Sequence, residues 1–96
     1  MNRSDLDAAV ANAVGSTRAE AHRAIEAALD AIRDAIARAE EVRLPGFGTF
    51  DFKDYAAKQG RNPQTGAPAE IPAARRVRFR AGREFKTAAT TGMKAA

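Results

Sequence analysis

The stretch GRNPQTG, residues 60–66, decides how the second half of the chain folds. It holds two glycines, one proline and one arginine, and it lacks any large apolar side chain. This composition is typical of a tight turn, because glycine and proline supply the backbone angles that turns require. The surrounding residues 56–72 contain three prolines and a single large aliphatic side chain, Ile71, so the segment cannot bury itself. We therefore expect residues 56–72 to project as a two-stranded arm with the turn at its tip.

Alternating residues on both sides of the arm predict strands. Residues 49–55 read Thr-Phe-Asp-Phe-Lys-Asp-Tyr, and residues 76–80 read Arg-Val-Arg-Phe-Arg. Side chains two apart in a strand share a face, so the second segment carries three arginines on one face and apolar residues on the other. Such a row is favourable where phosphates lie across it. The alternative is an edge strand whose charges protect it against aggregation.

The first 40 residues have the periodicity of helices. One helix is expected over residues 3–14, ended by Gly15, and a second from Thr17, its N-cap, to about residue 38. The second helix is not expected to read DNA, because its exposed face carries four carboxylates that phosphates would repel. Its apolar stripe, together with apolar residues of the second half, forms the expected dimer core: Ile25, Leu29, Ile32, Ile36, Leu44, Phe47, Phe50, Phe52 and Phe79.

Charge is divided unevenly along the 96 residues. Residues 1–41 have a net charge of −3, whereas residues 42–96 have a net charge of +7. A basic half of this kind favours a polyanion as partner, either nucleic acid or an anionic membrane. The chain has no cysteine and one histidine, so neither a disulfide nor a metal site is expected. A domain this small is marginally stable alone, and a second subunit is the favoured source of additional core.

Four motifs carry a resemblance to a known family. GFGTF (46–50), GRNPQTG (60–66), EIPA (70–73) and FRAG (79–82) occur in an order and spacing that resembles the bacterial HU and integration host factor proteins, over about residues 1–90. The resemblance implies an α+β fold in which two chains intertwine, each with an N-terminal helix pair, a three-stranded antiparallel sheet with a protruding β-arm, and a short C-terminal helix. The implied domain spans residues 1–91, with a helical dimerisation base at 1–40, sheet and arm at 41–82, the last helix at 83–91 and a flexible tail at 92–96.

The resemblance also implies a function, most like that of HU. Such a protein is a histone-like component of the nucleoid in the bacterial cytoplasm, and it is not an enzyme and needs no cofactor. It binds double-stranded DNA through the minor groove with little sequence preference, and prefers bent, nicked or gapped forms. Its arms wrap the duplex and a tip proline wedges into a base step, which bends and compacts the DNA. The expected DNA-binding residues are Lys53, Tyr55, Lys58, Arg61, Asn62, Pro63, Gln64, Arg75, Arg76, Arg78, Arg80, Arg83 and Lys86, with backbone amides of Gly46 and Gly48.

Several alternatives stay open at this point. An integration-host-factor-like subunit with site preference is the first, and a heterodimer with a paralogue is an alternative to the expected homodimer. RNA is a further expected partner, because much of the affinity is backbone electrostatics. A membrane role is disfavoured, because the basic half lacks an amphipathic helix with aromatic anchors. Two departures from the family pattern affect single contacts: Tyr55 stands where arginine is usual, and Arg76-Val77 where Val-Pro is common.

Overall fold

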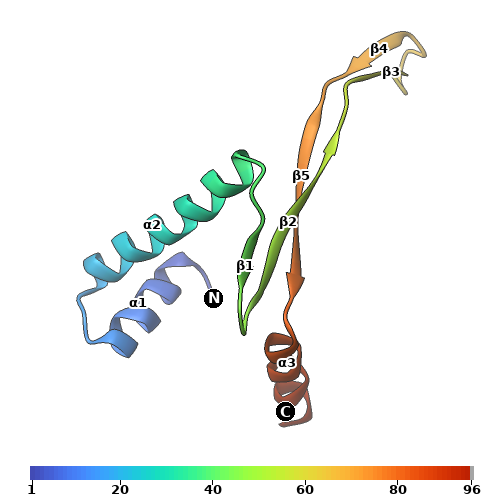
Figure 1. Ribbon diagram of the computed structural model, residues 1–96. Helices are drawn as coiled ribbons and strands as arrows, with labels where there is room; N and C mark the ends of the chain where they lie inside the picture. The colour runs from blue at the N-terminus through green and yellow to red at the C-terminus, as the bar shows by residue number, and fades with distance from the viewer. Residues whose placement is uncertain (96) are drawn as a thin grey trace.

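The chain forms a helix hairpin, a narrow sheet, an extended arm inserted between two strands of that sheet, and a C-terminal helix (Figure 1). The computed structural model describes residues 1–95. Its elements are α1 (Arg3–Val14), α2 (Arg18–Ala37), β1 (Val42–Leu44), β2 (Gly48–Tyr55), β3 (Lys58–Arg61), β4 (Pro68–Ile71), β5 (Ala74–Ala81) and α3 (Arg83–Ala95). This order and pairing confirm the predicted α+β fold with two N-terminal helices, an antiparallel sheet and a C-terminal helix. The arm and α3 lie at opposite ends of the sheet, and α1 and α2 lie to one side of it (Figure 1).

Side-chain caps define the helix hairpin. Asn2 and Asp5 form a capping box at the start of α1, and Gly15 ends that helix in the left-handed conformation at φ 72°. At the start of α2 the hydroxyl of Thr17 accepts a hydrogen bond from the Glu20 amide at 3.1 Å. These caps place both helices within one residue of their predicted bounds, because they satisfy amides that the helix itself leaves unpaired.

A polar cluster joins α1 to α2. The buried Asp7 carboxylate lies 2.7 Å from His22 Nδ1 and 3.4 Å from Arg3 Nε. Arg3 also reaches Glu26 at 2.6 Å, which forms an ion pair between the two helices. The hydrogen bond from His22 lowers the pKa of Asp7 below its usual value, while burial acts in the opposite direction. The cluster fixes the register of the two helices.

The central sheet has the order β1-β2-β5 and is antiparallel throughout. Pro45 and Gly46 form the turn from β1 to β2: Gly46 has φ 82°, and the Phe47 amide donates to the Leu44 carbonyl at 3.0 Å. This is the geometry of a type II turn, in which proline fixes φ at the first central position and glycine supplies the positive φ at the second. In β5, Ala81 ends the strand and Gly82 leads directly into α3.

The last helix is longer than the sequence pattern predicted. Helix α3 continues to Ala95, so the end predicted at residue 91 is wrong, and residues 92–95 are helical rather than a flexible tail. Residue 96 lies outside the described residues. Gly92 costs only about 1 kcal/mol in a helix interior, and Ala88 and Ala89 in the preceding turn favour helix, so one glycine does not terminate it. Near its start Phe85 packs edge-on against Phe47, with ring centroids 5.1 Å apart.

The single chain has almost no core of its own. Within residues 1–93, whose burial the structure describes, the buried apolar residues are three alanines, Ala11, Ala21 and Ala35. The radius of gyration is 19.1 Å. A compact domain of this length has a radius of about 12–13 Å. None of the helices in the described part of the chain is long and apolar enough to cross a membrane.

Candidate nucleic-acid interface

The arm is a separate two-stranded sheet beyond the end of the body. Strands β3 and β4 pair from Lys58↔Ile71 to Arg61↔Pro68, which confirms the hairpin expected within residues 56–72. The body sheet ends at the pair Tyr55↔Ala74, three residues before the first pair of the arm on each strand. Residues 56–57 and 72–73 lie between the two sheets and belong to neither. We call these four residues the joint, because ladder pairing is interrupted there.

A local hydrogen-bond network holds the tip of the arm. The Asn62 amide donates to the Ala67 carbonyl at 2.8 Å, and the Gly66 amide donates to the Asn62 carbonyl at 2.7 Å. The side-chain oxygen of Asn62 accepts from the Gln64 amide at 2.8 Å, an Asx turn that encloses Pro63. Pro63 is exposed at the tip, as the sequence predicted. Asn62 thus contributes its side-chain oxygen to the turn, which leaves its NH2 group for a partner.

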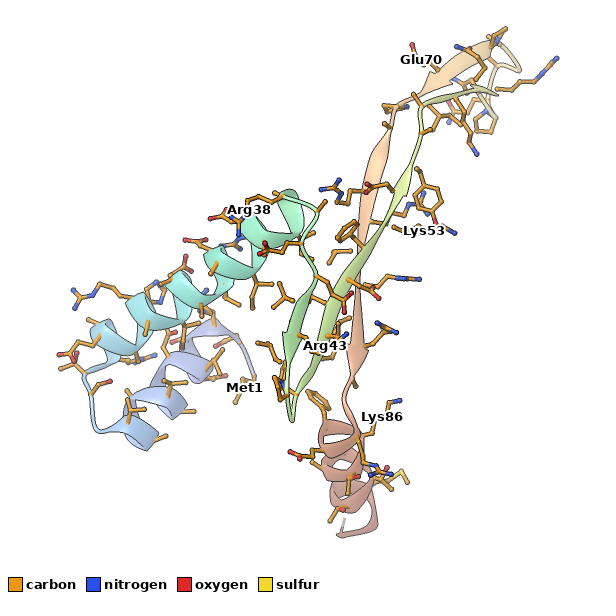
Figure 2. The ribbon with its side chains drawn as sticks, viewed as in Figure 1. Met1, Arg38, Arg43, Lys53, Glu70 and Lys86 are labelled. Carbon is orange, nitrogen blue, oxygen red and sulfur yellow. The ribbon has the colours of Figure 1, made fainter. Side chains whose placement is uncertain are left out.

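Cross-strand register gathers the basic residues of the body on one face. Strand β5 places Arg76, Arg78 and Arg80 opposite Lys53, Asp51 and Thr49 of β2, respectively. Directly opposed residues share a face, so these side chains form one surface, which we call the basic face. Lys53 and Lys86 both lie on the side of the molecule turned away from α1 and α2 (Figure 2).

One carboxylate lies within the basic face. Asp51 is buried, and its two oxygens lie 3.0 Å from Arg78 Nε and 3.0 Å from Arg80 Nε. The arginine side chains remain 59% and 64% exposed. The sequence pattern identified the arginines but not this internal partner. The alternation of residues 49–55 places Asp51 on the outer face, and only the register of β2 against β5 shows which cations it meets.

Tyr55 lies next to two cations at the arm end of the basic face. The Arg76 guanidinium carbon is 4.8 Å from the centre of the Tyr55 ring, and Lys53 Nζ is 5.5 Å from it. Cations at these distances are attracted by the negative face of the ring. Tyr55 therefore contacts two neighbouring positive charges.

Arg75 occupies a different environment from the one predicted. It lies on the opposite face from Arg76, where it donates to both Asp54 oxygens at 2.6 and 2.9 Å. It also donates to the carbonyls of Ile36 and Ala37, at the end of α2, at 2.9 and 3.0 Å. This hydrogen-bonded pairing lowers the pKa of Asp54 and raises that of Arg75. The guanidinium is thus occupied by partners within the chain, and the expected contact of Arg75 with DNA stays a prediction.

The two glycines predicted to offer amides differ. Gly46 is exposed in its turn, and its role stays a prediction. Gly48 is buried and pairs with Leu44 and Ala81, so its backbone is less accessible than that of Gly46, and its contact with DNA stays a prediction. A Cβ at Gly48 would lie 2.6 Å from the Phe79 ring and 2.7 Å from the Arg80 carbonyl oxygen, which explains why packing requires glycine there.

The remaining predicted contacts lie at the two ends of the sheet. Lys58 and Arg61 are exposed on β3, and Arg83 and Lys86 are exposed on the first turn of α3. The structure therefore distributes exposed cations from the arm, across the basic face, to the start of α3. Among the described residues, no cluster of three or more potential metal-ligating side chains occurs.

An exposed basic face beside a proline-tipped arm defines a nucleic-acid-binding type of module. The model of the family described as bacterial DNA-binding protein matches residues 1–90, and the chain belongs to this family. It is 43% identical over 88 residues to the DNA-binding protein HU of Staphylococcus aureus, covering 92% of this chain and 98% of that protein. It is 41% identical, with the same coverage, to the DNA-binding protein HU of Geobacillus stearothermophilus.

Solved structures agree with this membership. An Anabaena HU–DNA cocrystal structure matches with a TM-score of 0.79 and 38% identity, covering 93% of this chain and 97% of that chain. The family is one of DNA-binding proteins, in agreement with the prediction that the chain is not an enzyme.

Proposed function

We propose that this protein is a homodimeric, histone-like protein that binds double-stranded DNA through the minor groove, with little sequence preference, and bends it. The observation that carries the proposal is the continuity of the basic face with an arm whose tip exposes Pro63. The related HU proteins carry DNA binding in their names, and the Anabaena HU was solved with DNA. By this proposal the protein acts in the nucleoid of the bacterial cytoplasm.

A second copy of the chain is the proposed source of the missing core. Five apolar residues line an open groove between α2 and the sheet: Leu29, Ile32, Ile36, Phe50 and Val77. Val77 is 58% exposed and Phe79 is 41% exposed, and both lie on the apolar face of the sheet. Burying such side chains contributes about 1.5–3 kcal/mol each, which a chain with only alanines in its core needs. We therefore propose a homodimer; the heterodimer with a paralogue stays an alternative.

The arm is proposed to lie along the minor groove. The minor groove is about 6 Å wide, too narrow for a helix, and its base edges present a hydrogen-bonding pattern that is nearly independent of sequence. Arg61, the free amide of Asn62, and Gln64 supply donors suited to that groove. Pro63, held forward by the turn, is the apolar group proposed to enter a base step. Insertion requires unstacking of the step, so DNA that is already bent, nicked or gapped should bind more tightly.

The decisive experiment is a titration into two unrelated duplexes of equal length, and into a nicked copy of one, at several salt concentrations. The proposal expects similar affinity for both duplexes, tighter binding to the nicked form and a steep loss of affinity with salt. A strong preference for one duplex would instead support a site-specific role of the integration host factor kind. Binding that does not depend on salt would contradict the proposed interface. A single-stranded RNA of equal length measures the proposed secondary binding of RNA.

A further inference from the structure

Arg75 connects three segments that are distant in sequence. Its guanidinium binds both oxygens of Asp54 at the end of β2 and the last carbonyls of α2, and its carbon lies 4.8 Å from the centre of the Phe52 ring. The guanidinium group has five N–H donors. The bonds to Asp54 and α2 involve all three of its nitrogens. Little donor capacity remains for a DNA phosphate.

The contact between Arg75 and Asp54 lies next to the base of the arm. Asp54↔Arg75 is the second-last pair of the body sheet, and Tyr55↔Ala74 is the last pair before the joint. The arm therefore departs from the body one pair beyond the Arg75 side chain. At the other end of the contact is the C-terminus of α2, the longest helix of the chain. Arg75 thus ties the base of the arm to the most extended rigid element of the body.

Both partners of Arg75 favour a planar cation. The C-terminus of a helix carries a partial negative charge and unpaired carbonyls, which attract a cation. A carboxylate and two carbonyls in different directions match the forked geometry of arginine, whereas a lysine ammonium is a point charge and cannot bind in this bidentate way. The side chain is 32% exposed, so bulk water screens this arrangement only in part.

We propose that Arg75 is a positioning residue that sets the direction in which the arm leaves the body, rather than a ligand of DNA phosphate. Asp54 serves the same role from β2. The effect on DNA bending rests on the proposed function, whereas the effect on the arm does not. Without the Arg75 contact, the end of β2 and the start of β5 lose their attachment to α2, and the joint extends into the body sheet.

The first test uses the DNA-free protein and measures amide hydrogen exchange. Arg75→Gln and Arg75→Lys should both accelerate exchange in residues 54–58 and 71–75, while the turn end of the sheet, around Gly48 and Ala81, stays unchanged. Arg76→Gln is the matched control, because it removes the same charge one residue away on the opposite face. If both Arg75 variants show the same amide exchange as Arg76→Gln, the proposal is overturned. Circular dichroism confirms that each variant is folded.

The second test separates positioning from phosphate binding. A phosphate ligand removed from both copies in a dimer should reduce the salt slope of DNA affinity by about 1.8, and Arg80→Gln should show this reduction. Arg75→Gln should leave the slope unchanged and reduce the bend angle, measured by energy transfer between the DNA ends. A slope reduced as in Arg80→Gln would make Arg75 a phosphate ligand and refute the positioning role. If wild-type protein shows no salt-dependent binding, the proposed function fails, while the exchange experiment still decides the role of Arg75.

Discussion

Replacing Asp51 by asparagine should tighten DNA binding. The carboxylate holds Arg78 and Arg80 at 3.0 Å, and phosphates must compete with it for both guanidinium groups. An ion pair of this kind, with an exposed cation, contributes about 0–1 kcal/mol. Taking the middle of that range, the two pairs in each chain together contribute about 1 kcal/mol. A dimer doubles this value, and the affinity of Asp51→Asn should rise by about ten- to thirtyfold. Asparagine preserves the shape of the buried side chain.

The assay is a fluorescence anisotropy titration with a nicked duplex at several salt concentrations. Asp30→Asn is the matched control: it removes the same charge from α2, where Asp30 pairs with Arg33, but leaves the basic face unaltered. The gain should be largest at low salt and should exceed that of the control. Equal or weaker binding by a folded Asp51→Asn variant would refute the reasoning, because it would mean that Arg78 and Arg80 do not exchange the carboxylate for phosphate.

Three further predictions concern the tip, the helix end and acid stability. Pro63→Ala should reduce the DNA bend measured by energy transfer more than it reduces affinity; an unchanged bend would reject the wedge. Ala39, which follows α2, has the left-handed φ of 62°, a conformation that glycine adopts more easily than alanine. Ala39→Gly should stabilise each chain by about 0.5–1 kcal/mol, because relief of left-handed strain exceeds the entropy that glycine loses; an unchanged or lower urea midpoint would contradict this. The lowered pKa of Asp7 means that its stabilising effect is present above the ordinary value of 3.8 and is lost as the pH falls through the lower pKa of the folded state. The difference in unfolding free energy between wild type and Asp7→Asn should therefore shrink in acid. A difference that does not change with pH would contradict a stabilising role of the ionised Asp7 carboxylate.

Local signals in the sequence predicted most of the fold. Gly15 and Thr17 bound the two helices because a left-handed residue and a hydroxyl cap act on their immediate neighbours. Pro45-Gly46 defines its turn for the same reason. The end of α3 was predicted too early, because a single glycine lowers helix stability only slightly and leaves the helix intact.

The candidate site was less predictable, because its chemistry depends on contacts between distant segments. Alternation identified the faces of β2 and β5, but the pairing of Asp51 with two arginines depends on strand register. Arg75 reaches carbonyls 38 and 39 residues earlier in the chain, and no local pattern encodes that contact. The burial of Gly48 likewise follows from its position between two neighbouring strands.

The arm can change in length only in discrete steps. Strands β3 and β4 pair residue for residue from Lys58↔Ile71 to Arg61↔Pro68. Adding one residue to each strand would turn the whole tip, with Pro63, to the opposite face, because successive side chains alternate. Adding two to each strand preserves the facing of the tip and extends the reach by about 7 Å, the height of two residues along a strand. The length of the arm therefore changes in steps of two residues per strand, and relatives that span longer DNA segments should differ here by an even number of residues in each strand.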